Sequence, residues 1–279
     1  MTFQGVGASY RRVYREALLA GAGPRVLEIL PDHFFAEPEA LDALAERYTL
    51  VFHDVGLSLA TAREPSELRA RCARIAALVA RARPVLFSDH LALTRSPGGI
   101  DLGHLAPAWL TPALLDHLSG RVCALQDALG VPVALENIAA PFVIPGGMPE
   151  PEFLARLVER TGCGLLLDLT NLLLTARNVS AGAARAPGEG ADARRRLQEY
   201  PLHAVRQVHL AGGFRDRRGV WVDSHSEPVE DESYALLAEL RPRATGLLAI
   251  VIERDDKLPE LEQLMLEAER ARRVWEGTA

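Results

Sequence analysis

Ionisable and amide side chains in this sequence fall at the ends of short apolar runs. Several of these runs, which are rich in Val, Ile and Leu, carry a His, Asp, Glu or Asn among their last residues. Imidazoles and carboxylates that converge without cysteine suit iron, manganese or zinc. Carboxylates held close together would repel one another unless cations neutralised them. The candidate metal ligands are His53, His90, Glu136, Asp168, Asn171, His209, Asp223, His225 and Glu253.

Each of these residues also has a structural interpretation when it is taken alone. Asp168 could cap a following helix, because Asp is a good N-cap residue, and the segment from Asp223 to His225 could form a turn. The joint pattern favours a metal site, since four of the eight histidines lie at or just beyond the ends of these runs, together with four acids. We treat three other histidines as structural: His104, His117 and His203.

The elements that position these residues alternate regularly along the chain. We predict eight strands, each followed by a longer segment with helical spacing: Gly5–Ser9, Arg25–Pro31, Leu50–Val55, Val85–His90, Val131–Asn137, Gly164–Asp168, Val205–Ala211 and Leu248–Glu253. Fully apolar strand cores suit parallel strands that are buried on both faces. Eight alternating βα units favour a closed barrel over an open sheet. We therefore expect a single (β/α)8 TIM barrel over residues 1–279, with the metal site at the C-terminal ends of the strands.

Amphipathic helices are predicted over Ser66–Arg83, Pro112–Leu129 and Pro151–Arg160. Two stretches break the alternation: Thr94–Pro112, which contains Pro97-Gly98-Gly99, and Ala176–Ala193, which is rich in Gly, Ala and Arg. Connections of this length in a compact domain are usually active-site loops or partly disordered segments.

Composition excludes several classes of function. The formal net charge of -6 gives no bulk basic character for binding nucleic acid or an acidic membrane surface. The three cysteines are widely spaced and fit neither a disulfide framework nor a Cys-x-x-Cys metal site. No apolar run reaches transmembrane length, and the first residues lack the features of a signal peptide. We expect a cytoplasmic protein that binds neither nucleic acid nor membrane.

Other polar residues near the predicted strand ends are candidates for catalysis or substrate contact. They are Asp54, which follows His53, and the pair Asp32-His33, which could also form the turn that starts a helix before Phe34. Glu28 lies inside the second predicted strand and is expected to face the barrel interior as a polar layer residue. Arg11 and Arg12 could line the mouth of the barrel or be exposed.

Taken in order, seven segments resemble the blocks of one family, domain-of-unknown-function 692. They are His53-Asp54-Val55-Gly56-Leu57-Ser58-Leu59, Ser88-Asp89-His90-Leu91-Ala92, Leu135-Glu136-Asn137, Leu167-Asp168-Leu169-Thr170-Asn171, His209-Leu210-Ala211-Gly212, Asp223-Ser224-His225 and Ile252-Glu253. This family comprises multinuclear non-haem iron oxidative enzymes typified by the catalytic subunit of the methanobactin oxidase. The resemblance covers nearly the whole chain.

The resemblance implies three metal positions. The first ion would be bound by His53, His90 and Glu136, with Glu136 bridging to a second ion. The second would be completed by Asp168, His209 and Glu253, and a third would be held by Asn171, Asp223 and His225. Members of the family use iron and dioxygen to modify cysteine residues of ribosomally made precursor peptides, often with a small partner protein that recognises the leader of the peptide.

The sequence departs from the family pattern at a few places. Asp54 stands where the family usually has a small residue, Asp89 replaces a usual Glu, and Thr170 replaces one Asn of a usual pair. The first strand also lacks an expected His soon after its end. The metal set survives these changes, so they bear on the substrate more than on the ligands.

Other functions are available to the same ligand set. Similar barrels serve as zinc phosphoesterases that act on DNA, or as sugar isomerases, and zinc or manganese would then replace iron. A DNA enzyme should show basic and intercalating side chains near the mouth, and a sugar isomerase commonly has a catalytic lysine. The only lysine, Lys257, lies just past the eighth predicted strand. A non-enzymatic metal-binding scaffold is a third alternative. We expect the oxidative enzyme.

Overall fold

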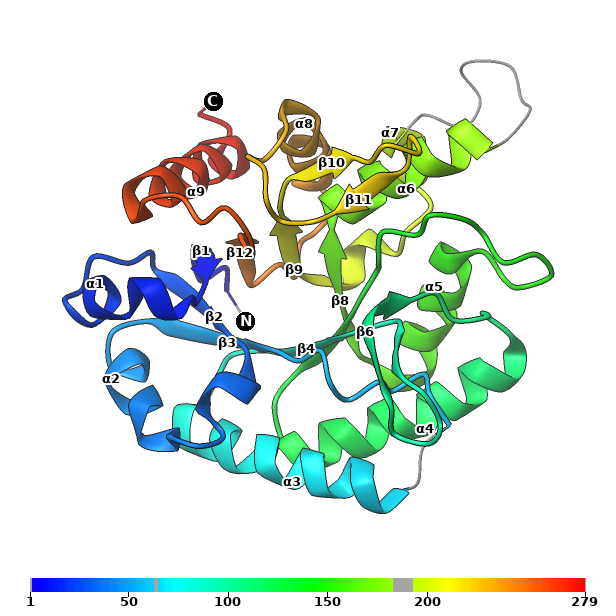
Figure 1. Ribbon diagram of the computed structural model, residues 1–279, viewed down its shortest axis with the longest axis horizontal. Helices are drawn as coiled ribbons and strands as arrows, with labels where there is room; N and C mark the ends of the chain where they lie inside the picture. Colours follow the sequence, from blue (N-terminus) through cyan, green and yellow to red (C-terminus); the bar gives the residue numbers. More distant parts are fainter. Residues whose placement is uncertain (1, 63–64, 183–192, 279) are drawn as a thin grey trace.

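Eight parallel strands form a closed barrel in the computed structural model of the protein (Figure 1), which describes residues 2–62, 65–182 and 193–278. The order around the barrel is β1, β12, β9, β8, β7, β4, β3, β2. These strands are β1 (Gly5–Ser9), β2 (Val26–Ile29), β3 (Thr49–His53), β4 (Phe87–His90), β7 (Val133–Glu136), β8 (Gly164–Asp168), β9 (Val205–Leu210) and β12 (Ala249–Ile252). The predicted (β/α)8 barrel is confirmed. Most of the predicted strands are too long by one to three residues, because flanking residues such as Val85, Val131 and Asn137 lie outside the paired segments.

Helices connect the strands and cover the outside of the barrel (Figure 1). They are α1 (Arg15–Leu19), α2 (Asp42–Ala45), α3 (Pro65–Ala82), α4 (Pro112–Leu129), α5 (Glu150–Thr161), α6 (Leu169–Gly182), α7 (Ala193–Leu197), α8 (Asp231–Leu240) and α9 (Leu261–Glu276). Sequence signals fix the ends of α4: the Thr111 side chain accepts a hydrogen bond from the backbone N–H of Leu114, and Gly130 ends the helix with φ of 64°.

Within the described residues, single turns of 3-10 helix lie in the connections: η1 (Arg12–Tyr14), η2 (Pro31–Phe34), η3 (Pro38–Leu41) and η4 (Leu202–Ala204). The pair Asp32-His33 belongs to η2, so the turn that the sequence offered as an alternative does form there.

The two irregular stretches contain more regular structure than the sequence predicted. Thr94–Pro112 carries most of an antiparallel ribbon made of β5 (Leu93–Arg95) and β6 (Asp101–Ala106). Its turn is possible because Gly99 adopts φ of 84°, which a glycine does at no steric cost. Ala176–Ala193 was expected to be a loop, but α6 continues through its first residues to Gly182, and residues 183–192 lie outside the described residues. A second ribbon, β10 (Gly213–Arg215) with β11 (Trp221–Asp223), follows β9.

The barrel interior is built in layers, and this explains where the polar groups lie. A buried apolar layer includes Val26, Val51, Ala134, Leu166 and Val251. Side chains two residues apart on a strand point to the same face. The residue two positions after each of these therefore also points inward, one layer nearer the mouth: Glu28, His53, Glu136, Asp168 and Glu253. All five are buried. The two-residue alternation of side chains along each strand therefore places these polar groups in one layer.

In the part of the chain that the structure describes, no helix combines the length and the apolar character needed to cross a membrane.

Candidate metal centre

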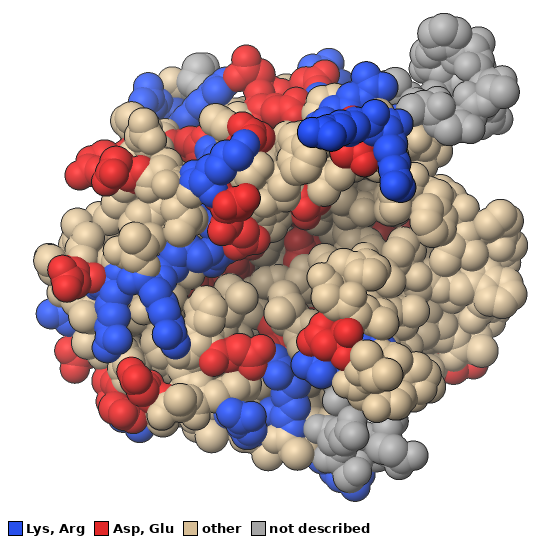
Figure 2. Space-filling view, viewed as in Figure 1, with Lys and Arg blue, Asp and Glu red and all other residues tan. Residues whose placement is uncertain are grey.

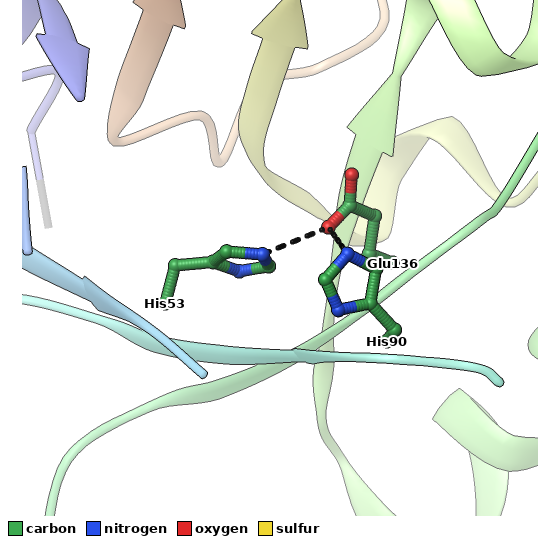
Figure 3. Close-up of side chains that lie close together, drawn as sticks. All are labelled: His53, His90 and Glu136. Carbon is green, nitrogen blue, oxygen red and sulfur yellow. Dashed lines mark ion pairs between the residues drawn. The ribbon is translucent and has the colours of Figure 1, made fainter. Parts of the chain in front are cut away.

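The first group of candidate ligands joins three neighbouring strands, β3, β4 and β7 (Figure 3). The carboxylate oxygen Oε2 of Glu136 lies 3.4 Å from Nε2 of His53 and 3.2 Å from Nε2 of His90. The two imidazole rings are 4.6 Å apart between centroids. Ser88 Oγ lies 2.9 Å from Nδ1 of His53 and orients that ring. The three side chains present one ligand atom each, all within 4.8 Å of one another, which is a spacing that one ion can occupy.

The second group shares Glu136 with the first. It consists of Glu136, Asp168, His209 and Glu253, whose ligand atoms also lie within 4.8 Å of one another. Nδ1 of His209 is 3.4 Å from Oε1 of Glu136 and 2.8 Å from Oε2 of Glu253. The two oxygens of Glu136 thus face different groups, as a carboxylate that bridges two ions would.

The protonation of the second group reflects strong coupling among buried charges. Burial disfavours the imidazolium of His209, but the adjacent Glu253, Glu28 and Glu136 outweigh this effect and raise its pKa well above the usual range. Burial raises the pKa of Asp168, and the nearby carboxylates of Asp223 and Glu136 raise it further. This crowding of acids is what a bound cation would relieve.

Unpaired buried oxygens test whether the residues fit a metal ion. Glu136 Oε2, Asp168 Oδ2 and Asn171 Oδ1 are buried and make no hydrogen bond within the described part of the chain. Buried acceptors of this kind are normally satisfied, and hard or borderline cations take oxygen and imidazole ligands. The donor set therefore fits ions bound at both groups.

The residues expected for a third ion lie beside the second group. His225 Nε2 is 3.0 Å from Oδ1 of Asp223 and 3.8 Å from Oε2 of Glu253. The backbone of His225 adopts φ of 51°, which is uncommon for a residue other than glycine and occurs at functional sites. The backbone N–H of Asn171 donates a hydrogen bond to Oδ1 of Asp168 at 2.8 Å, which places Asn171 beside the second group.

A cavity of about 500 Å³ connects these groups with solvent. His53, His90, Glu136, Asn171 and Glu253 line its inner part, and the ribbons β5–β6 and β10–β11 contribute to its walls. Figure 2 shows the hollow in this face, with acidic side chains inside it. We call it the metal cavity.

Two residues at the metal cavity, His104 and Asp255, were not predicted from the sequence, and a third, Arg11, was predicted there only as one of two alternatives. His104, which we expected to be structural, lines the cavity from β6. Oδ2 of Asp255 lies 2.8 Å from Nδ1 of His225. Arg11 donates to Asp255 and, through Nε, to the carbonyl oxygen of Arg254 at 2.7 Å, so this arginine lines the mouth, one of the two placements that the sequence allowed. The irregular segment Thr94–Pro112, which contains His104, is the one feature of the sequence that could have indicated this residue.

The candidate catalytic residues Asp54, Asp32 and His33 do not line the metal cavity. Asp54 is buried and accepts hydrogen bonds from the backbone N–H groups of Gly56 and Leu57. Its Oδ1 lies 2.5 Å from the guanidinium of Arg71, which also reaches Asp32 at 2.9 Å. The structure therefore joins Asp54 and Asp32 through one arginine, behind the strand that carries His53.

The chain is similar in sequence to proteins of one family. The family model described as RiPP precursor modification enzyme MbnB/TglH/ChrH, where RiPP denotes a ribosomally made and modified peptide, matches residues 5–276. A UPF0276 protein of Chromobacterium violaceum is 37% identical over 268 residues, 95% of this chain and 92% of that protein. One of Streptomyces avermitilis is 39% identical over 259 residues, which is 89% of this chain and 49% of that protein, so the chain spans about half of this relative.

Solved structures with a similar fold are more distant. A xylose isomerase-like TIM barrel protein from Mycobacterium smegmatis in complex with magnesium aligns with a TM-score of 0.60 at 14% identity, covering 96% of this chain and 90% of that one. Endonuclease IV from Thermus thermophilus aligns with a TM-score of 0.55 at 19% identity, covering 99% and 100%. At such identities the likeness shows the fold alone. The sequence match over nearly the whole chain shows more, and the protein belongs to the MbnB/TglH/ChrH family of RiPP precursor modification enzymes.

Proposed function

We propose that this protein is a multinuclear iron-dependent enzyme that uses dioxygen to oxidise cysteine residues of a ribosomally made precursor peptide. The observation that carries the proposal is the position of Glu136, whose two carboxylate oxygens face two separate groups of candidate ligands. Membership of a family of precursor-modifying enzymes supports a peptide as the substrate. When bound, iron supplies the redox chemistry, in which the cysteine is oxidised and dioxygen is reduced.

The residues of the chain would hold and shield this chemistry. The first ion is assigned to His53, His90 and Glu136, and the second to Glu136, Asp168, His209 and Glu253. The third and outermost is assigned to Asn171, Asp223 and His225, which all line the metal cavity. A peptide would approach from the mouth of the metal cavity, where both ribbons contribute to the walls.

The acidic and positioning residues around the ions have proposed roles of their own. The carboxylate of Asp255 lies beside Nδ1 of His225, and we propose that this ion pair holds the ring with Nε2 toward Asp223 and Glu253. For Asp54 and Asp32 we propose an indirect role, in which Arg71 fixes the turn after β3 and thereby the position of His53. His33 packs 6.2 Å from the ring of Tyr10 between centroids, and its role in substrate contact stays a prediction. So does the small leader-recognition partner.

The alternative is a zinc- or manganese-dependent hydrolase or a sugar isomerase on the same barrel. Lys257, the only lysine of the sequence, is 66% exposed, pairs with Glu227 and does not line the metal cavity. This placement disfavours an isomerase that needs a lysine in its barrel. Among the described residues that line the cavity, Arg11 is the only Lys or Arg and it is bonded to Asp255. A cavity lined by several acids and a single paired arginine lacks the basic side chains that bind the phosphates of DNA, and this disfavours DNA as the substrate.

Metal analysis and a thiol test distinguish the two functions. Protein purified under nitrogen is expected to hold two or three irons per chain, with coupled iron signals in Mössbauer spectra. A cysteine peptide added under nitrogen should produce an absorption band from thiolate bound to iron, and its mass should change only after dioxygen is admitted. Zinc as the sole metal, with no thiolate band and no mass change after iron loading, would favour hydrolysis instead.

A further inference from the structure

A second cavity adjoins the metal cavity. Its volume is about 250 Å³, and Ile138 lines both cavities. Ile138 follows Glu136 by two residues, and another wall residue, Leu91, directly follows His90. Two residues of extended chain span about 7 Å. The second cavity therefore begins within one or two residue lengths of the first ligand group.

The walls of the second cavity are mostly apolar. They come from the segment between β6 and α4 and from the segment between β7 and α5, with α6 and α7 closing the far side. The apolar wall residues on the first two segments are Pro107, Ala108, Leu110, Phe142, Ile144 and Met148. A concave site with walls of this kind favours an apolar ligand group.

In the described part of the chain, four polar side chains also line this cavity, and we call them its polar floor: Glu150, Thr175, Arg196 and Glu199. Tyr200 donates a hydrogen bond to Oε2 of Glu150 at 2.5 Å. Burial raises the pKa of Glu150, which reduces the tendency of this floor to attract a cationic side chain. Nε of Arg196 is buried and has no hydrogen-bond partner among the described residues, but Glu199 places an opposite charge on the same lining. Apolar residues form the larger part of the lining and are therefore expected to select the occupant.

The rim of the second cavity exposes large apolar side chains. Phe142 and Val143 are 58% and 61% exposed, and Trp109, at 57%, stands on the neighbouring segment. Together they are three of the eight large hydrophobic side chains exposed among the described residues. In Figure 2 the surface to the right of the hollow, where the segment after β7 runs in Figure 1, carries few charges. Apolar groups gathered in one exposed place mark a binding surface.

We propose that the second cavity is a subsite that takes one apolar side chain of the precursor peptide, at a residue one or two positions from the reacting cysteine. We call it the apolar subsite. It rests on the proposed function, because a cysteine in the metal cavity fixes which neighbouring side chain reaches Ile138. The shared lining residue selects this occupant, because a peptide whose cysteine lies among the ligands passes beside Ile138, which lines both cavities.

The test uses the metal-loaded protein under nitrogen, which prevents turnover. The probes are blocked pentapeptides in which a central cysteine has two glycines on each side. Leucine replaces each glycine in turn, and glutamate at the same positions is the polar control. Calorimetry is expected to show that leucine at one position lowers Kd about tenfold or more, whereas glutamate there does not. Equal Kd for leucine and glycine at all four positions would overturn the proposal.

Two substitutions locate the effect in the protein. Ala140→Trp fills the apolar subsite and should reduce the advantage of leucine to within about twofold while leaving the Kd of the glycine peptide unchanged. Ala77→Trp, at an exposed position of α3, is the matched control and should keep the full advantage. Should Ala140→Trp fail to fold, Phe142→Ser, at an exposed site, should lower the advantage about threefold. A full advantage of leucine in a folded Ala140→Trp protein would contradict the assignment.

Failure of the subsite and failure of the proposed function give different results. Replacing the cysteine of the glycine peptide by serine should abolish binding if a thiol enters the metal cavity. Thiol-dependent binding without a preference for leucine would remove only the apolar subsite. Equal binding of the serine and cysteine peptides would overturn the proposed function, and with it this assignment of the second cavity.

Discussion

The carboxylate of Glu28 contacts Nε2 of the His209 ring, on the side away from the candidate metal ligands. Oε2 of Glu28 lies 2.7 Å from Nε2 of His209, and both side chains are fully buried. Ser9 and Gln207 also donate to this carboxylate, at 3.0 and 2.5 Å. With Nε2 committed to Glu28, the ring presents Nδ1 to Glu136 and Glu253. A carboxylate behind a ligating histidine fixes the orientation and the tautomer of the ring and raises its basicity.

Glu28→Gln should therefore weaken metal binding without unfolding the protein. Glutamine keeps an oxygen near His209 but loses the charge, so we expect metal affinity at the second group to fall about 10- to 100-fold. Competition with a chelator of known affinity measures this change. Glu46→Gln, whose side chain is 76% exposed, is the control. Unchanged metal affinity in Glu28→Gln would show that the contact serves only the packing of the barrel interior.

Glu136→Ala tests the shared carboxylate. Because Glu136 contributes to both groups whereas Glu253 contributes to one, Glu136→Ala should lose metal from both, and Glu253→Ala should keep the ion held by His53 and His90. Elemental analysis after dialysis against metal-free buffer compares the two variants. Equal metal content in Glu136→Ala and the parent protein would rule out a bridging role.

The strand period is the reason that the ligand set could be predicted from the sequence. Glu136, Asp168 and Glu253 each follow an inward apolar residue by two positions, and in a closed barrel all strand ends meet at one mouth. Glu28 follows the same rule, and its expected place in a polar layer is confirmed. These positions depend only on local alternation and on barrel closure.

Positions that depend on loop paths could not be predicted in this way. His104 reaches the cavity because β6 folds back on β5, and the turn residues indicate a hairpin without indicating where it lies. Arg71 meets Asp54 across 17 positions of sequence, because α3 packs behind β3. Such contacts are set by tertiary packing, and no pattern within either segment shows them.

Asp168→Asn should separate stability from metal binding. The pKa of Asp168 is raised above its usual value, mainly by burial and then by Asp223 and Glu136. A raised folded-state pKa means that the ionised group destabilises the metal-free fold, and this loss develops as pH rises above the usual pKa of Asp toward the raised one. Neutral asparagine avoids that loss.

We therefore expect Asp168→Asn to raise the Tm of the metal-free protein by a few degrees at pH 7, and to have little effect near pH 3. The same variant should bind less metal at the second group. Calorimetric melting with and without metal measures both effects, and Asp127→Asn at an exposed position is the control. A lower Tm in the metal-free variant at pH 7 would show that the carboxylate stabilises the fold through hydrogen bonds that outweigh its desolvation.

Asp54→Ala distinguishes a positioning role from a catalytic one. The Asp54 carboxylate is buried, is bonded to two backbone N–H groups and pairs with Arg71. Its removal leaves these donors without their acceptor, so the free energy of unfolding should fall by roughly 2–4 kcal/mol. Asp32→Ala removes the exposed partner of the same arginine and should cost less than about 1 kcal/mol.

Denaturant unfolding measures both free energies, and metal content and oxidation of a cysteine peptide are followed in parallel. A positioning role predicts that activity falls together with metal bound at His53, whereas full metal content with lost activity would assign Asp54 a direct part in the chemistry.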